Sequence, residues 1–379
     1  MFLSNFIKKL NWQRIEKSRE IRFKIVKKMW KSTTKQVSIT ELQKTKSILV
    51  WGGGGIGDAI VISGFVKVLI ENGFEVSVVA SERNCEFFNT MKMLKRIFIM
   101  HEERYVSSKE LLKIYGKRKF DLLIVLYGKD SFIEAYSLLK FYKTLNISYI
   151  MGFDDSLGLY DISINYMGTG LKRRMDEHFS KRFYYLLAQL GIKEYNLSYC
   201  IDIPQKYIDE TCSFIDLFKN KKIVCLNPFS STEFRDFSFE QIKKILNYLD
   251  AKKNIVVILL GTKKQMDSLK NIALPKTAII SPFEDFFYGA CIVKLADLII
   301  TTDTSIVHLA NAYNKRMICV YNNRRLDYGE SNNIVWGPNY ENALQLFTKA
   351  NKGTPDGDYI RDFDVEEMYP YIDKDLSIR

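Results

Sequence analysis

The chain has 379 residues, of which 47% are hydrophobic and 13% aromatic, and only 7 are proline. Its length predicts two domains, and its composition excludes a largely disordered chain. No run of about 18 or more apolar residues is present, and lysines interrupt the short apolar start, so we expect neither a membrane-spanning helix nor a signal peptide.

The positive charge is concentrated at the amino end. Residues 1–35 contain eleven Lys or Arg and two Glu, so they contribute +9 of the net charge of +12. Aromatic residues, among them Phe2, Phe6, Trp12 and Trp30, lie between these cations. An amphipathic helix on an anionic membrane has this composition, and each cation near such a surface contributes about 1 kcal/mol. A nucleic-acid-binding arm and a solvated helix packed on the body are the alternatives. We expect an arm over 1–45 that binds an anionic membrane surface through residues 1–35, and no nucleic-acid partner.

From Lys46 onwards, strand and helix patterns alternate. In the first half, strands are predicted at 47–51, 74–80, 121–126 and 148–152, with a helix at 58–72. A polar helical stretch near 200–222 precedes strands at 222–227, 255–260, 277–280, 298–302 and 317–321, with a helix at 240–251. This alternation predicts parallel, doubly wound sheets. The fold class is therefore α/β, with Rossmann-like domains over 46–200 and 201–350 and a less regular tail over 351–379.

A glycine loop, Gly52-Gly53-Gly54-Gly55-Ile56-Gly57, lies between a strand and a helix and matches the GxGxxG pattern of dinucleotide binding. Asp58 follows in the first helical turn, where its carboxylate would repel a pyrophosphate. This repulsion argues against an NAD-dependent oxidoreductase with Glu82 on the ribose, which is kept as an alternative. The sequence favours a surface without side chains (Gly54, Gly55 and Gly57) that lets a bulky neutral substrate approach Asp58, whose charge the helix dipole stabilises. An ordinary N-cap role is the structural alternative for Asp58.

A second motif, Asp303-Thr304-Ser305-Ile306-Val307-His308-Leu309-Ala310, runs from a predicted strand into a helix. Asp303, Thr304 and Ser305 are all suitable N-cap residues, and a helix N-terminus binds anions readily. His308 lies about one turn further on and can reach the same ligand. The alternative is an ordinary capped helix with a surface histidine.

Cysteine and histidine spacing predicts no metal site. The six cysteines lack a CxxC pair, and His101, His178 and His308 are far apart in the sequence. Several cysteines fall in predicted core strands, which is typical of reduced thiols in a cytoplasmic protein.

Together these motifs resemble glycosyltransferase family 9, the heptosyltransferase family. The segment from Leu49 to Ile60 resembles its amino-terminal motif, and residues 303–310 resemble its donor-site motif. The other landmarks, in the family's order, are Met151–Asp154, Asp176–Phe179 with Leu186 and Leu187, Asn227–Phe237, Leu259–Gly261 and Val335–Pro338. The resemblance covers about residues 46–365.

The resemblance implies a GT-B fold, two facing Rossmann-like domains with a cleft between them. It implies an inverting, metal-independent transfer of a sugar from a nucleotide diphosphate, with Asp58 as general base. The positions that match the donor or diphosphate site are Ser230, Ser231, Arg235, Gln265, Asp303, Thr304, Ser305 and His308. Three of these differ from the family's usual residues, since Arg235 replaces a lysine, Ser305 a glycine and Gln265 an acidic residue.

The resemblance also implies the substrates and the place of the reaction. The expected donor is ADP-heptose, with no cofactor, and the acceptor is a lipopolysaccharide core or another lipid-linked surface glycan. Fixed dipoles at residues 303–306 and the Arg235 cation would stabilise the departing diphosphate. We expect the protein in the cytoplasm, on the inner face of the inner membrane. A catalytically inactive homologue that only binds such ligands is the remaining alternative.

Overall fold

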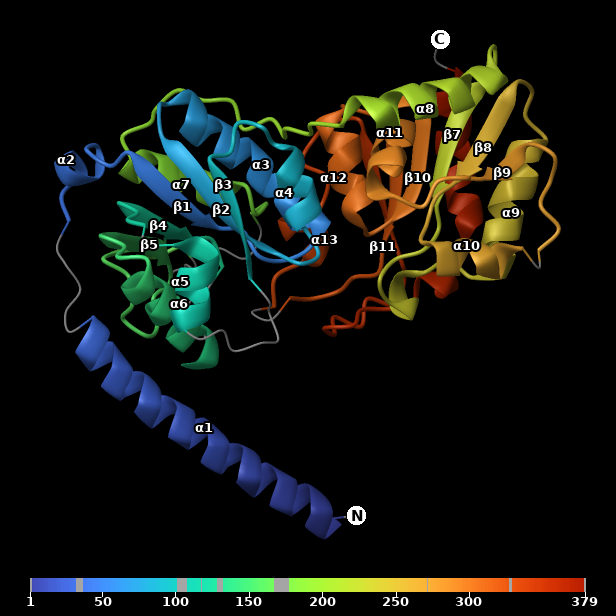
Figure 1. The fold of residues 1–379 in the computed structure, drawn as a ribbon. Helices are drawn as coiled ribbons and strands as arrows, with labels where there is room; N and C mark the ends of the chain where they lie inside the picture. Colours follow the sequence, from blue (N-terminus) through green and yellow to red (C-terminus); the bar gives the residue numbers. More distant parts are fainter. Residues whose placement is uncertain are drawn as a thin grey trace. The chain divides into compact units, whose positions relative to one another are not determined.

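The computed structural model describes residues 2–31, 37–100, 108–116, 118–127, 132–166, 177–270, 272–326 and 329–377, with side chains from Arg14 onwards in most of these ranges. His101, Lys35 and Asp176, and the side chains of Phe2, Phe6 and Trp12, lie outside what is described. The chain forms two compact units, each built on one sheet (Figure 1). The first comprises Met1–Gly55, Gly64–Arg174 and Ser180–Leu197, and the second Ile56–Ser63, Met175–Phe179 and Ser198–Arg379.

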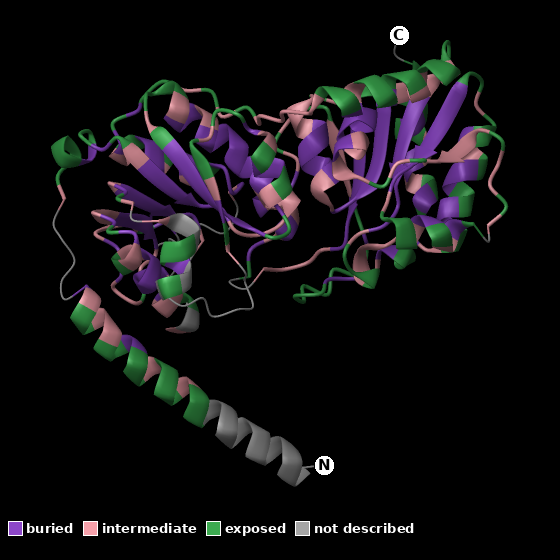
Figure 2. Ribbon diagram, in the orientation of Figure 1, coloured by how far each residue is buried: buried purple, intermediate pink, exposed green. Residues whose placement is uncertain are grey.

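The first unit holds a six-stranded sheet in the order β3-β2-β1-β4-β5-β6, with every neighbouring pair parallel. The strands are β1 Ser47–Trp51, β2 Glu75–Ser81, β3 Arg96–Met100, β4 Leu122–Val125, β5 Tyr149–Phe153 and β6 Ile162–Ile164. The helices are α4 Cys85–Thr90, α5 Ser108–Tyr115, α6 Phe132–Thr144, α7 Lys181–Gln189 and the second half of α3 Ile56–Glu71, whose residues up to Ser63 belong to the second unit. Strands β1 and β4 are buried almost completely, as expected for apolar runs covered on both faces of a parallel sheet (Figure 2).

The second unit repeats this plan with the order β12-β11-β10-β7-β8-β9, again wholly parallel. Its strands are β7 Lys222–Asn227, β8 Ile255–Leu259, β9 Ala278–Ile280, β10 Leu298–Thr302, β11 Met317–Tyr321 and β12 Ala343–Phe347. Its α-helices are α8 Gln205–Ile215, α9 Phe239–Asp250, α10 Lys263–Leu269, α11 Phe286–Leu295, α12 Ser305–Ala312, α13 Asn332–Val335 and α14 Tyr369–Ser377. Short 3₁₀ helices occupy Asp216–Phe218, Glu233–Arg235, Ile360–Asp362 and Val365–Met368.

The predicted doubly wound α/β class is confirmed, and the strands that the sequence did not predict lie at sheet edges. Strands β3, β6 and β12 were not predicted, and each is an edge strand. Edge strands are covered less completely. Polar residues interrupt β6 and β12 at Ser163 and Gln345, and Phe98 is the one residue of β3 that is buried. The expectation of a less regular tail is wrong at its end, because α14 buries Ile372 in the core of the second unit.

The amino-terminal helix α1, Phe2–Trp30, is not a separate arm over its whole length. Phe23 is buried, and Val26 and Trp30 pack beside it against the core of the first unit. The Phe23 and Phe132 ring centroids lie 5.6 Å apart, so this half of the helix contacts α6 directly. The packed-helix interpretation therefore applies to this second half. None of the described helices is both long and apolar enough to cross a bilayer.

A buried ion pair fixes the end of α1. Lys31 Nζ lies 2.7 Å from Asp161 Oδ2, with side chains only 2% and 0% exposed. The same Asp161 oxygen accepts the amide hydrogen of Ile150, the second residue of β5. One turn before Lys31, Lys27 Nζ donates to the carbonyl oxygen of Leu157 at 2.8 Å. The short helix α2, Ile39–Leu42, then leads into β1.

Candidate active site

The predicted donor-site residues of the second unit lie at the carboxyl ends of its strands. The loop after β7 carries Ser230, Ser231 and Arg235, the turn after β8 leads to Gln265 in α10, and the turn after β10 carries residues 303–308. Strands β7 and β10 are hydrogen-bonded neighbours although β8 and β9 lie between them in sequence. The strand order therefore reverses here, which is where doubly wound sheets bind ligands.

Arg235 and Asp303 form an ion pair that joins two of these loops. Arg235 Nη1 lies 2.7 Å from Asp303 Oδ2 and also donates to the Asp303 carbonyl oxygen at 3.2 Å. Its Nη2 donates to Ser231 Oγ at 2.8 Å. Asn332 Nδ2, at the start of α13, donates to the same Asp303 oxygen at 2.8 Å. The Asp303 carboxylate is thus engaged by two donors, and it orients the guanidinium.

Thr304 is the N-cap of α12. Its side chain accepts the amide hydrogen of Ile306 at 3.3 Å, while Asn227 Nδ2 donates to the same hydroxyl at 3.1 Å. Asn227 is the last residue of β7 and also donates to Thr301 Oγ1 at 3.0 Å. This network fixes the start of α12 against the end of β7, with the first turn of the helix at the loop that carries Arg235.

Gln265 connects the turn after β8 to the loop after β7. Its Nε2 donates to the Ser230 carbonyl oxygen at 2.8 Å, and its Oε1 accepts the amide hydrogen of Thr262 at 2.9 Å. The second contact belongs to a capping box in which Thr262 and Gln265 satisfy each other's amides. Ser230 is held in turn by a hydrogen bond from its amide to Asp236 Oδ1 at 2.6 Å.

His308 is buried, so the alternative of a surface histidine is wrong. Its ring lies 6.4 Å from those of Tyr199 and Trp336, and its Nδ1 has no hydrogen-bond partner among the described residues. Burial lowers the pKa of the imidazole to about 4, because the charged form is poorly solvated there. His308 is therefore neutral near pH 7, and one buried nitrogen remains available for a ligand or water.

The glycine loop places the start of α3 against His308. A Cβ at Gly57 would lie 2.9 Å from His308 Cδ2 and 3.6 Å from Ser305 Cα, so this approach requires glycine. The residues Ile56–Ser63, which include Asp58 in the first turn of α3, are grouped with the second unit. Gly57, Ser305 and His308 are thus brought together, and Asp58 follows Gly57 directly.

Gly54 and Gly55 belong to the first unit, where the loop is held from strand β2. Gly54 has φ +101°, a conformation that favours glycine. Ser81 Oγ donates to the Gly54 carbonyl oxygen at 2.6 Å, and Asn84 Nδ2 donates to that of Gly52 at 2.9 Å. The side chains that hold this loop were not predicted.

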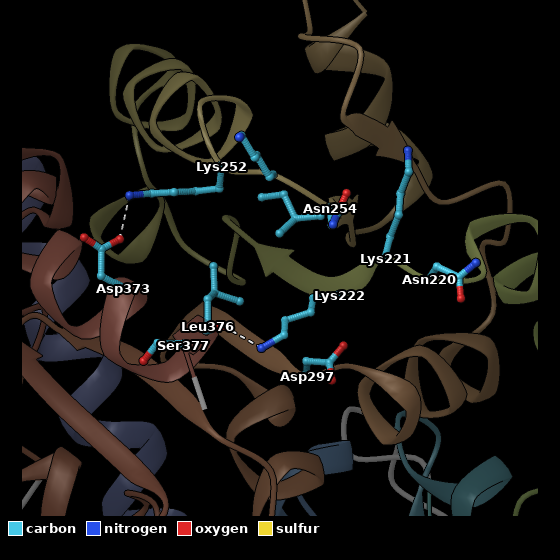
Figure 3. A pocket seen from close by; sticks show the side chains of 11 residues that line it. Asn220, Lys221, Lys222, Lys252, Asn254, Asp297, Asp373, Leu376 and Ser377 are labelled. Carbon is cyan, nitrogen blue, oxygen red and sulfur yellow. Dashed lines mark hydrogen bonds and ion pairs between the residues drawn. The ribbon is translucent and has the colours of Figure 1, made fainter. Parts of the chain in front are cut away.

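A cavity of about 620 Å³ lies at the amino ends of the strands of the second sheet, opposite the carboxyl ends that carry the predicted site (Figure 3). It is lined near the amino ends of β7 and β8 and by α14, and it contains none of the predicted site residues. Lys252 Nζ pairs with Asp373 at 2.6 Å, and Lys222 Nζ donates to the Leu376 carbonyl oxygen at 2.5 Å. In the described parts of the chain, no group of three or more His, Cys, Asp or Glu is placed to hold a metal ion.

Comparison with known proteins identifies the family. The family model for glycosyltransferase family 9 (heptosyltransferase) matches residues 111–354, more than half of the chain. The chain belongs to glycosyltransferase family 9. It is therefore a glycosyltransferase with a GT-B fold of two Rossmann-like domains, and this replaces the oxidoreductase interpretation of its glycine loop.

Relatives of this family 9 member extend over most of its length. A protein of Escherichia coli (strain K12), provisionally named lipopolysaccharide heptosyltransferase 4, is 25% identical over 335 residues, 87% of each chain. A family 9 crystal structure from Veillonella parvula DSM 2008 has a TM-score of 0.69 at 15% identity, covering 89% of this chain and 98% of that one. The E. coli heptosyltransferase WaaC with ADP-2-deoxy-2-fluoro heptose has a TM-score of 0.63 at 14% identity, covering 86% and 99%.

Two asparagines that contact the predicted residues were not predicted as site residues. Asn227 lies within one of the family landmarks, and Asn332 lies outside them. Nothing in the sequence places Asn332 beside Asp303, because the two are 29 residues apart and meet only through the turn after β11. A polar residue at the end of a buried strand, as at Asn227, was the available signal.

Proposed function

We propose that this protein is an inverting, metal-independent glycosyltransferase that moves a heptose from ADP-heptose to a lipopolysaccharide core or related surface glycan. The observation that carries this proposal is that Arg235 pairs with Asp303 at the capped start of α12, the helix that also carries His308, whose buried Nδ1 has no partner among the described residues. Family membership and the heptose analogue held by WaaC support the donor class.

On the donor side, the leaving group is a nucleoside diphosphate. As the bond from the anomeric carbon to its phosphate oxygen breaks, negative charge grows on that oxygen. The amide groups at the start of α12 point towards such an anion, and the helix dipole favours it. Arg235, held by Asp303 and Ser231, adds a fixed cation. Groups fixed in advance in this way stabilise developing charge without having to reorganise.

On the acceptor side, Asp58 is the general base. An acceptor hydroxyl attacks the anomeric carbon from the face opposite the diphosphate, its proton passes to the Asp58 carboxylate, and the configuration inverts. The carboxylate lies in the first turn of α3, where the helix dipole stabilises its charged form. The absence of a side chain at Gly57 lets the start of α3 approach His308 closely.

The cellular place of the reaction follows from the acceptor. A lipid-linked glycan is presented at a bilayer surface, and the net charge of +9 in residues 1–35 suits the anionic inner face of the inner membrane. We place the protein there, peripherally and from the cytoplasmic side.

The proposal is tested by measuring thermal stabilisation with ADP, UDP, GDP and CMP, followed by transfer assays with ADP-heptose. We expect ADP to stabilise the protein most, transfer to persist in EDTA, and the product to carry the inverted anomeric configuration by NMR. Retention of configuration would contradict the mechanism, and preference for another nucleotide would contradict the donor.

A further inference from the structure

Helix α1 has a second apolar face, opposite the one that packs on the first unit. Ile21, Ile25 and Met29 are 52%, 55% and 72% exposed. They are spaced four residues apart, so they form one stripe along the helix. Phe23 and Trp30 point to the other side, into the contact with α6. The exposed stripe is therefore left over after the helix has made its contacts with the rest of the unit.

The charges of α1 are distributed unevenly around this stripe. Both of its acids are paired within the helix, Glu16 with Arg19 and Glu20 with Lys24, each at 2.5 Å. Lys17, Arg22 and Lys28 are exposed and have no carboxylate within ion-pairing distance in the described parts of the chain. They flank the stripe, since Lys17 lies one turn before Ile21 and the other two adjoin Ile21 and Met29.

We propose that this face, defined by Ile21, Ile25, Met29, Lys17, Arg22 and Lys28, is a docking surface for an anionic lipid bilayer. An apolar stripe flanked by unmatched cations fits the boundary between acyl chains and anionic headgroups. A nucleic-acid backbone would satisfy the cations alone and leave the Ile and Met side chains exposed. The inference deepens the proposed function, because it rests on an acceptor presented at a membrane.

The contacts that hold α1 on the first unit give this surface a fixed orientation on that unit. The Lys31–Asp161 pair, with both side chains almost fully buried, fastens the carboxyl end of the helix to the loop before β6. Phe23 lies one turn from Lys27, which contacts the Leu157 carbonyl oxygen. The stripe therefore lies on the half of α1 that belongs to the folded unit, and it presents one defined face of that unit to the bilayer.

The test uses the full-length protein and co-sedimentation with vesicles of phosphatidylglycerol and phosphatidylcholine in equal parts. We expect the triple variant Ile21→Ser/Ile25→Ser/Met29→Ser to bind at least about tenfold more weakly than wild type. The matched control, Ile39→Ser/Leu217→Ser/Leu295→Ser, removes three exposed aliphatic side chains elsewhere and should bind as wild type does.

A second pair of variants separates a local surface from overall charge. Lys17→Gln/Arg22→Gln/Lys28→Gln and Lys219→Gln/Lys243→Gln/Lys276→Gln lose the same three charges, all from exposed positions. We expect only the first to lose at least about tenfold in vesicle affinity, because attraction to the surface falls off within a Debye length. Pure phosphatidylcholine vesicles should bind wild type poorly.

Several outcomes would contradict the proposed docking surface. Wild-type binding by both α1 variants, or equal losses in both charge variants, would show that this face does not dock. Binding to duplex DNA with no binding to vesicles would assign it to nucleic acid instead. ADP affinity, measured on the same variants, should be unchanged. A protein that binds ADP but no vesicles contradicts only this surface, and one that binds vesicles but no nucleotide contradicts only the proposed function.

Discussion

Two side chains at the donor site, those of Arg235 and Asn332, donate to the Asp303 carboxylate. Asp303 accepts hydrogen bonds from both Arg235 and Asn332, so its negative charge is paired with the Arg235 guanidinium and orients it. A bare carboxylate near a diphosphate would repel it, whereas a paired one fixes the guanidinium that attracts it. Asn332 is therefore a positioning residue in the proposed site.

A double-mutant cycle with ADP tests this coupling. Arg235→Ala should weaken ADP binding roughly tenfold or more, because a charge-assisted hydrogen bond contributes about 1.5–3 kcal/mol. Asn332→Ala should cost less, and almost nothing once Arg235 is gone, since it acts through that residue. Calorimetry provides the dissociation constants. Asn333→Ala, whose amide contacts Gln345 at 3.2 Å, is the control and should bind normally. Fully additive losses would remove Asn332 from the network.

The general-base assignment is tested by Asp58→Asn. The substitution keeps the size of the side chain but cannot take a proton, so kcat should fall by about 10²–10⁴-fold. ADP affinity and melting temperature should stay close to wild type, because Asp58 acts on the acceptor. Steady-state rates with ADP-heptose provide the measurement. An unchanged kcat would exclude Asp58 as the base.

His308 should make stability depend on pH. Its pKa is lowered to about 4 in the folded protein, below the ordinary value of 6.5, so the unfolded chain binds the proton more readily. Its contribution is complete above pH 6.5 and is lost as pH falls towards 4, by roughly 3 kcal/mol in total. In urea unfolding across this range, wild type should lose stability relative to His308→Phe as pH falls. Parallel curves would show that burial does not govern this imidazole.

At the scale of elements, the sequence is informative where burial is complete on both faces. Strands β7, β10 and β11 have the predicted bounds because their apolar runs are continuous. The edge strand β12 was missed, since it is only partly covered and Gln345 interrupts its apolar run. The docking of α1 was one of three open interpretations. It depends on Asp161, 130 residues away, and no local pattern reports that contact.

The buried attachment of α1 to the first unit predicts that substitutions of Lys31 and Lys24 differ strongly in their effect on the free energy of unfolding. Lys31→Met removes a buried cation that lies 2.7 Å from the fully buried Asp161 carboxylate, which should cost about 3–5 kcal/mol of unfolding free energy. Lys24→Met breaks an exposed pair with Glu20 and should cost less than about 1 kcal/mol. Urea denaturation of both variants supplies the comparison. Similar losses in the two would show that the buried pair does not hold the helix.

For the whole molecule, two repeated sheets with separate cores follow from the alternating pattern, and each site motif falls at the end of a predicted strand. Asp303–His308 after β10 and Ser230–Arg235 after β7 are far apart in sequence, and parallel pairing of their strands brings them together. The contacts that complete the site, from Asn332 and between Gly57 and His308, depend on loop paths that a single sequence does not encode locally.

Hydrogen exchange with and without ADP tests which part of the molecule takes the donor. At 100 times its dissociation constant, ADP should add about 2.7 kcal/mol of stability. Because the proposed site lies at the carboxyl ends of β7 and β10, protection should rise in residues 228–236 and 303–310. The strands of the first unit should exchange as before, and so should residues 252–255 and 373–377 beside the lysine-lined cavity. Arg235→Ala at the same ADP concentration is the control and should show weaker protection in both loops. Protection centred on the cavity would move the nucleotide to the opposite edge of the sheet and contradict the donor site.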